Sequence, residues 1–325
     1  MAAALISDLE ALVRETYLLW DPGWVTFNWR GYTYDHVQRV RGLSLTLCRR
    51  EGGDLEVMEL AALLHDITKP YDGEYVLDAQ GQRLVDAHGY WRNELRRPPR
   101  SNQVTSLYDA LGLAGQLHNE SGAAIAEALL RQRSLPETLC SSVAETIRHH
   151  LRPPNDAPIE SQCLYDADTI DANIGLPAFV RNIYIRLHYH DQRKALEAPS
   201  AQWLLRHAPL DYLRPYIAEN LLPWVLGKRR DFVPRLQTAA AQSIALERLE
   251  RLEGIVARLS EEVQDWRRDG QRTCVDVVYH YMLHANDSSL AAETAYLAQT
   301  WQGPDVTVEA RQLIQQIWDE MAGIL

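Results

Sequence analysis

A histidine and an aspartate stand side by side at the end of a strongly apolar segment, and they carry the first indication of chemistry. Residues 55–64 are apolar on nearly every side of the helix that they predict, and His65 and Asp66 follow directly. Burying a polar group without a partner costs free energy, so this pair needs partners. A divalent metal ion is one such partner, because imidazole and carboxylate groups are among its common ligands.

Further candidate ligands lie at the ends, or on the apolar faces, of neighbouring predicted helices. They are His36, His118, His149 or His150, and Asp168. A helical bundle can bring such positions together in one cleft between helices. The pattern therefore predicts a metal site whose ligands come from several helices.

The choice between His149 and His150 follows from helical spacing. The apolar stripe of their helix includes Val143 and Ile147. His150 continues the stripe at plus three, whereas His149 faces away at plus two. We therefore expect His150 to be the ligand and His149 to be a neighbour of the site.

The elements that must position these residues are helices. Apolar residues recur at intervals of three and four almost throughout, and alternating runs are scarce, so the sequence predicts an all-α fold. Helices are expected at about residues 4–20, 34–50, 55–66, 115–132, 136–151, 161–194 (one or a pair), 203–226 (one or two), 233–265, 273–284 and 308–325.

Two regions and one interruption are predicted along the chain. Residues 1–195 hold the histidine-bearing helices and form the expected core, and residues 196–325 form a helical C-terminal region packed on it. From about 70 to 115 the periodicity is weaker, which predicts an insertion or lid that is partly helical.

Composition excludes several classes of function. The 325 residues carry a formal charge of −11, which argues against non-specific nucleic-acid or anionic-membrane binding. The sequence contains no run of about 18 apolar residues, so no membrane span is predicted. The N-terminus has the pattern of an amphipathic helix rather than of a secretory signal. Four widely spaced cysteines indicate a reducing cytoplasm. The GxGxxG, GxxxxGK[ST], GxSxG and HExxH motifs do not occur.

The ordered set of residues resembles the HD superfamily of metal-dependent phosphohydrolases, which carries an H…HD…D signature. The stretches 34–40, 50–54 and 60–67 carry the resemblance, and a "DADxxD" run at 166–171 completes it. In that run the usual ligand maps to Asp168, with Asp166 a neighbour and Asp171 structural. The segments at 118–123 and 147–150 resemble the "HxxxGA" and "IxxH" segments of members with two extra histidines. The resemblance covers about residues 30–195.

This resemblance implies an HD-domain helical bundle, with additional C-terminal helices, that binds one or two divalent metal ions. His36, His65, Asp66 and Asp168 would form one site, and His118 and His150 would make room for a second ion, with Asp66 as the bridge. The metal could be Fe, Mn, Mg, Ni, Co or Zn. The implied activity is hydrolysis of a phosphoester, of a nucleotide or another small phosphorylated metabolite, by a metal-activated water.

Basic residues near these ligands are candidates for substrate binding. Lys69 lies one turn past Asp66 and could offset phosphate charge, and "HDxxK" lysines of the family often contact substrate there. Arg148 and Arg152 flank the second-metal histidine. The predicted insertion carries Trp91 and four arginines. They could form a lid over an anionic substrate, or they could simply belong to a solvated polar loop. The arginines are Arg92, Arg96, Arg97 and Arg100.

Two other functions fit the same signature. HD-fold proteins with six ligands include di-iron enzymes that oxidise a small molecule with O₂, and an HD fold can also serve as a non-catalytic scaffold or regulatory interaction protein. A homo-oligomer is left open. His280 and His284 lie one turn apart, which can suit a metal, but no carboxylate pattern accompanies them, so they are interpreted as packing or surface residues.

Overall fold

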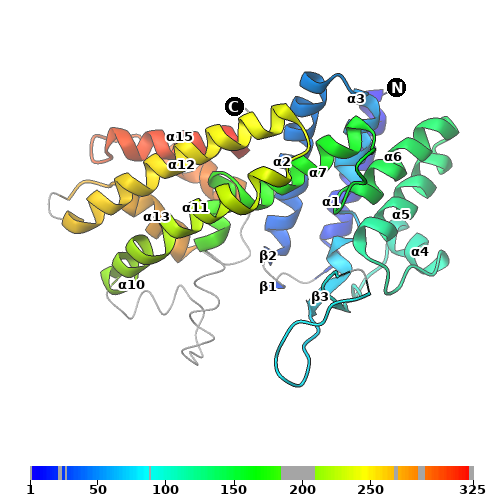
Figure 1. The fold of residues 1–325 in the computed structure, drawn as a ribbon, viewed down its shortest axis with the longest axis horizontal. Coiled ribbons are helices and arrows are strands. Elements are labelled where there is room, and N and C mark those ends of the chain that lie inside the picture. The colour runs from blue at the N-terminus through cyan, green and yellow to red at the C-terminus, as the bar shows by residue number, and fades with distance from the viewer. Residues whose placement is uncertain are drawn as a thin grey trace. The chain divides into compact units, whose positions relative to one another are not determined.

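The computed structural model describes residues 2–20, 24–25, 28–87, 89–183, 209–266, 270–284 and 290–321, and the fold is all-α, as predicted (Figure 1). The chain divides into two compact units, residues 1–165 and 166–325. This division falls within one helix, α7 (Ile159–Asn173). The boundary predicted near residue 195 lies outside the described residues and stays a prediction.

The first unit is built around a short buried helix. Helix α3 (Leu55–Leu64) begins at Asp54, whose carboxylate accepts hydrogen bonds from the amides of Glu56 and Val57. Seven of its ten residues are buried. Because α3 is apolar on nearly every side, it packs against four helices of this unit, as expected for a central element. These are α1 (Ala2–Tyr17), α2 (Arg30–Glu51), α5 (His118–Gln132) and α6 (Glu137–His149).

The segment predicted as an insertion contains strands as well as helix. A 3-10 turn, η1 (Lys69–Tyr71), leads into β3 (Asp72–Tyr75), which pairs antiparallel with β4 (Asn93–Leu95). Helix α4 (Gln103–Ala110) follows and begins with a capping box at Asn102. A second short pair, β1 (Trp24–Val25) with β2 (Asn28–Trp29), precedes α2. The β-hairpin was not predicted, while the partly helical character of the segment is confirmed.

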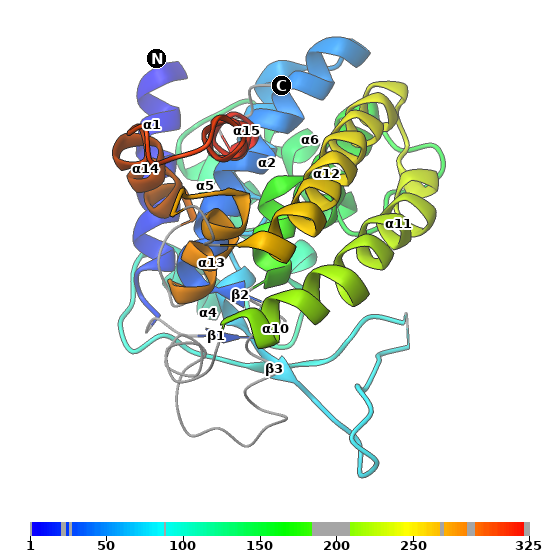
Figure 2. The same cartoon turned by 90° about the vertical axis from the view of Figure 1, so that its left-hand side faces the viewer.

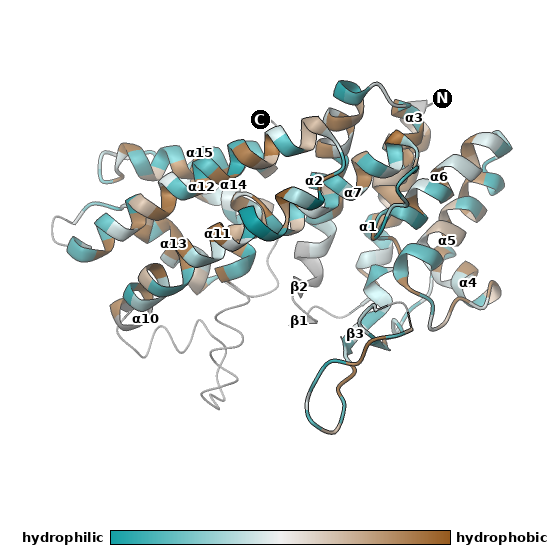
Figure 3. Ribbon diagram, viewed as in Figure 1, coloured by the Kyte–Doolittle hydropathy of each residue, from teal (hydrophilic) through white to brown (hydrophobic). Residues whose placement is uncertain are grey.

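The second unit is also helical, and its long helix is α12 (Ala239–Asp265). Apolar and polar residues alternate along α12 (Figure 3), and its buried face packs against α11 (Leu222–Asp231), which runs beside it (Figures 1 and 2). Its remaining described elements are residues 176–183, α10 (Pro209–Pro215), the π-helical η2 (Tyr216–Leu221), η3 (Val233–Arg235), α13 (Cys274–Leu283), α14 (Leu290–Thr300) and α15 (Val308–Met321).

Comparison with the predicted helices shows one omission in the second unit. Helix α14 was not predicted, and it packs against α15. The predicted helices at 161–194 and 203–226 fall partly outside the described residues. All four cysteines are buried and none forms a disulfide. Within the described ranges, no helix is both long and apolar enough to span a bilayer.

Candidate metal centre

The His65–Asp66 pair sits in a turn that neighbouring elements hold in place. Helix α3 ends at Leu64, and His65 caps it with helical backbone angles. The hydroxyl of Tyr17, on α1, donates a hydrogen bond of 2.8 Å to the backbone carbonyl of Asp66. The buried hydroxyl of Thr68 donates to the carbonyl of His118, at 3.0 Å. The turn is thereby tied to α1 and to the first residue of α5.

A glycine allows α5 to approach this turn closely. A Cβ placed on Gly122 would lie 3.0 Å from the backbone carbonyl oxygen of His65, which is tighter than ordinary contact. The side chain of Ser121, beside it, shares a 2.8 Å hydrogen bond with Thr68. Any larger residue at position 122 would therefore push α5, and His118 with it, away from the turn.

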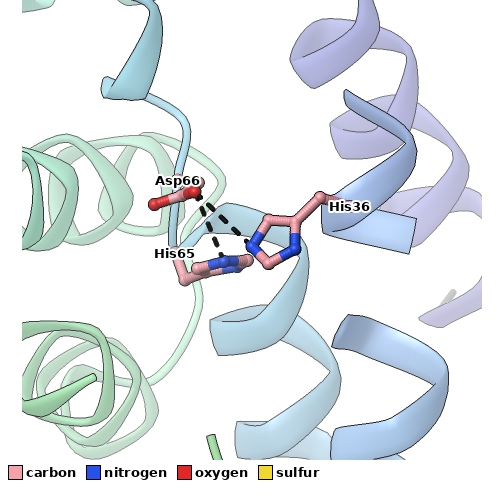
Figure 4. A group of neighbouring side chains, drawn as sticks. All are labelled: His36, His65 and Asp66. Carbon is pink, nitrogen blue, oxygen red and sulfur yellow. Dashed lines mark ion pairs between the residues drawn. The ribbon is translucent and has the colours of Figure 1, made fainter. Parts of the chain in front are cut away.

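Four imidazoles face the two oxygens of one carboxylate. The Nε2 atoms of His36 and His65 lie 3.8 Å and 3.7 Å from Oδ2 of Asp66 (Figure 4). The Nε2 atoms of His118 and His150 each lie 3.6 Å from Oδ1. All five residues are buried. The carboxylate of Asp66 thus stands between two pairs of histidines, one pair on each oxygen.

These separations are too long for hydrogen bonds and only a little longer than the spacing of two ligand atoms on one metal ion. Two ligand atoms that are each about 2.1 Å from one ion lie about 3.0–3.4 Å apart. Within the described residues, Nε2 of His65 and Oδ1 of Asp66 are buried without a hydrogen-bond partner. Such atoms are costly to bury unless a ligand from outside the chain satisfies them, so they fit a divalent metal ion well.

The histidine tautomers are fixed in the form that binds metal. Nδ1 of His65 lies 2.8 Å from the carbonyl of Ala62, and Nδ1 of His150 lies 2.7 Å from that of Ile147. Because a carbonyl oxygen only accepts, Nδ1 carries the proton in both rings. The lone pair is then on Nε2, the atom that faces Asp66.

The charge state of Asp66 also suits a ligand. Burial is the largest single influence and would raise its pKa. Without a metal, the positive charge of protonated His65, of Lys69 and of protonated His118 and His150 outweighs burial and holds the pKa of this carboxyl well below its usual range; a bound metal ion would take the place of the protons on the rings. Asp66 is therefore an anion at neutral pH, as a bridging ligand must be.

Asp72 is a functional residue that the sequence reasoning missed. Its Oδ2 lies 3.0 Å from Nδ1 of His118, which directs Nε2 of that ring toward Asp66. Nζ of Lys69 lies 3.5 Å from the same Oδ2 and 3.3 Å from Nδ1 of His118. Burial would raise the pKa of Asp72, but His118 and Lys69 lower it on balance. The available signal was an acidic residue six positions after Asp66.

The two neighbouring histidines point to different partners, as predicted. His150 reaches Asp66, whereas Nδ1 of His149 lies 3.2 Å from the hydroxyl of Ser161. The remaining predicted ligand, Asp168, is half-buried on the part of α7 that belongs to the second unit, and its role stays a prediction.

Asp166, expected to be only a neighbour of the site, has a structural role in the second unit. It is fully buried. Its carboxylate accepts hydrogen bonds of 2.8 Å from the amides of Gln237 and Thr238 and from the Thr238 hydroxyl.

The predicted substrate-binding arginines are engaged with other protein groups. Arg148 Nε donates to Glu120 at 3.1 Å, and the guanidinium of Arg152 lies 5.2 Å from the ring centroid of Tyr90. In the hairpin segment, Arg97 pairs with Asp109, and Arg100 donates to the carbonyl of Leu18. Trp91 packs its ring edge-to-face against Tyr75 and is half exposed. No contact among these places the arginines over the histidine cluster.

Comparison with known proteins identifies the domain. Residues 33–173 match the HD domain family, and this span contains the four histidines and Asp66 as well as Asp168. Residues 33–173 of the chain therefore form an HD domain, as the sequence predicted. At the family level this is the domain of metal-dependent phosphohydrolases, which bind divalent metal ions.

Other comparisons add little to this assignment. The chain is similar to the structure of Bacillus subtilis YpgQ in complex with ADP, at 16% identity and a TM-score of 0.40 over 80% of this chain and 96% of that one. Selenomethionine-labelled YpgQ from the same organism gives 15% identity and a TM-score of 0.38, over 80% and 95%. No curated protein matches the chain in sequence. Because both structural likenesses are weak, the family assignment rests on the matched residues.

Proposed function

We propose that this protein is a metal-dependent phosphohydrolase that cleaves a phosphoester of a nucleotide or another small phosphorylated metabolite. One observation carries the proposal. The buried carboxylate of Asp66 stands between two pairs of imidazoles, and its Oδ1 has no hydrogen-bond partner among the described residues. This is the ligand arrangement expected of a centre for one or two divalent ions, with Asp66 as the shared ligand.

The metal ions would supply the chemistry of hydrolysis, and the protein's residues would position them. Ions bound here would supply hydroxide near neutral pH and offset negative charge on a phosphoryl oxygen. The residues fix where this happens. His65 and His150 present Nε2 because their Nδ1 atoms donate to backbone carbonyls, and His118 does so because Nδ1 donates to Asp72. We expect Asp168 to add a carboxylate to the side of His36 and His65.

Lys69 is the best-placed cation for the substrate. Its ammonium lies beside His118 and Asp72, and its side chain is about one-third exposed, at 31%. An ammonium held at the rim of the centre can donate to a phosphate oxygen and offset its charge. Arg148 and Arg152 remain weaker candidates, since Arg148 pairs with Glu120, whereas Lys69 contacts His118 directly.

The charge of the whole chain makes such local cations necessary. At −11, the overall field repels an anionic substrate, so binding must come from the metal ions and nearby basic groups. The four buried free thiols support a reducing, cytoplasmic setting.

The test combines metal analysis with a screen of phosphoesters. Purified full-length protein is assayed for bound metal, then for phosphate release from nucleotides and sugar phosphates after reconstitution with each of Mn²⁺, Fe²⁺, Co²⁺, Ni²⁺, Mg²⁺ and Zn²⁺. We expect metal-dependent release from at least one substrate. The Asp66→Ala variant, purified in parallel, should release none, which separates true activity from contamination.

Two outcomes would replace this function. Bound iron with O₂ consumption and no phosphate release would assign the protein to the di-iron oxygenases of the HD fold. A protein that binds no metal at these histidines, and whose cellular role survives His65→Ala and Asp66→Ala, would be a scaffold.

A further inference from the structure

A second group of metal-ligating side chains lies in the second unit, outside the residues that match the HD domain. His280 is on α13 and His284 caps its C-terminal end, and Glu293 is on α14. Sequence reasoning found the two histidines but no carboxylate to accompany them. The structure supplies one, because the unpredicted helix α14 brings Glu293 to α13.

The three side chains converge at ligand distances. Oε2 of Glu293 lies 3.0 Å from Nε2 of His280. The rings of His280 and His284 stack with centroids 4.1 Å apart and planes inclined by 29°. One ligand atom from each residue lies within 4.8 Å of the other two. A small shift of side chains would place all three around one ion.

His284 is held in the tautomer that can bind a metal. Nδ1 of His284 lies 2.8 Å from the carbonyl of His280, so this nitrogen carries the proton and the lone pair is on Nε2. The same backbone device orients His65 and His150 in the first unit. His280 is buried, and the ring of Tyr296 stacks on it at 5.6 Å with planes only 12° apart.

The surroundings leave the group reachable from solvent. His284 and Glu293 are half-buried, and Tyr296 is half exposed, at 52%. On the other side, Trp301 packs edge-to-face on His280 with centroids 5.8 Å apart. His280 thus contacts two aromatic rings, while His284 and Glu293 are partly open to solvent.

We propose that His280, His284 and Glu293 bind a divalent transition-metal ion, for which Zn²⁺ is the best fit. Two imidazoles and one carboxylate form a common three-residue ligand set for zinc, with the fourth position left to water. Histidines one helical turn apart on α13 supply two adjacent corners, and Glu293 supplies the third. The bound ion would join α13 to α14, so its first effect is on the stability of the second unit.

The rival explanation is a hydrogen bond between Glu293 and His280 that only packs the two helices together. The experiment must therefore measure bound metal and must separate this site from the HD centre. The double variant His65→Ala/Asp66→Ala of the full-length chain removes ligands of the HD centre. After removal of metal with a chelator, Zn²⁺ is titrated into this variant calorimetrically, and retained zinc is measured after desalting.

We expect the double variant to retain about one equivalent of zinc. Adding His284→Gln should weaken zinc binding at least about 100-fold, whereas adding the matched surface change Glu250→Gln should leave it unaltered. Glu250 is exposed on α12. Absence of retained zinc in the double variant, or equal retention with and without His284→Gln, overturns the proposal.

A second measurement covers the case in which the double variant does not fold. Co²⁺ is titrated into the otherwise unchanged chain and into the single variants His284→Gln and Glu293→Gln, and the visible absorption is recorded. We expect a component of the spectrum to disappear in both variants. Identical spectra in all three proteins would show that the ion binds only at the HD centre and would overturn the proposal.

Discussion

Two buried carboxylates, Asp66 in the first unit and Glu320 in the second, differ in their hydrogen-bonding partners. Oε2 of Glu320 accepts from the amide of Leu176, and Oε1 pairs with Nη1 of Arg251, both at 2.7 Å. Arg248 lies 3.9 Å away and is itself buried. Asp66 faces four imidazole nitrogens at 3.6–3.8 Å, and Oδ1 accepts no hydrogen bond among the described residues.

This difference distinguishes a carboxylate that stabilises the fold, Glu320, from one that is arranged to bind a ligand, Asp66. A buried anion that the protein itself satisfies with donors contributes to stability, because removing it leaves unpaired groups. A buried anion among imidazoles needs positive charge, which comes either from protons on the rings or from a bound metal ion. At Asp66, the lack of a hydrogen-bond partner for Oδ1 among the described residues therefore indicates a ligand site rather than a structural role.

The largest effect is expected from Asp66→Asn. The amide keeps the shape but removes the shared negative ligand, so we expect phosphoester hydrolysis to fall by at least about 1000-fold in kcat/KM. Added metal should raise the melting temperature of the unchanged protein but not that of the variant, since binding to the folded state alone stabilises it. The matched control is Asp156→Asn, an exposed position in the same unit. Activity within about tenfold of normal would remove Asp66 from the centre.

The corresponding change at Glu320 should have the opposite profile. Glu320→Gln removes the charge that pairs with Arg251 and leaves the guanidinium of Arg248 buried without an anion. We expect the free energy of unfolding to fall by about 3 kcal/mol, measured by urea denaturation. Metal content and hydrolysis per folded molecule should be unchanged, with Glu250→Gln as control. Loss of metal with unchanged stability would contradict the distinction.

The parts that could be predicted from sequence are those set by local periodicity. An apolar run of ten residues that follows an N-cap aspartate and ends in His65 and Asp66 favours a buried helix that ends at a polar site. The stripe through Val143 and Ile147 likewise favours His150, and the structure directs that ring toward Asp66. Such inferences need only the 3.6-residue repeat of a helix.

The parts that could not be predicted depend on contacts between distant residues or on weak patterns. The segment between β3 and β4 has no buried apolar face to reveal it, since its apolar residues Leu77, Val85 and Trp91 are exposed. The apolar positions of α14 are mostly alanines, so its periodicity is faint. Missing α14 also meant missing Glu293, and nothing local indicated that Asp72 would reach His118.

A smaller effect is expected at Asp72, which touches the centre only through His118 and Lys69. Asp72→Asn retains a hydrogen-bonding group but removes the charge that directs the His118 ring. We expect metal affinity to fall about 10- to 100-fold, as is typical when the partner of a ligating histidine is removed. Metal titration against a competing chelator measures this, with the exposed Glu94→Gln on β4 as control. Unaltered affinity would mean that backbone contacts alone hold His118.

The smallest effect concerns Glu293 and appears only below neutral pH. Burial, followed by the neighbouring His284, lowers the pKa of His280, whereas Glu293 raises it. The unfolded chain then binds a proton more readily than the folded one, so this histidine's stabilising contribution is present above about pH 6.5 and is lost as pH falls. Glu293→Gln removes the carboxylate that partly offsets this lowering, so the pKa of His280 should fall further. In metal-free protein, we expect its melting temperature relative to the unchanged chain to drop by about 2–4 °C between about pH 7.5 and 5.5. Parallel pH profiles for the two proteins would show that Glu293 does not act on His280.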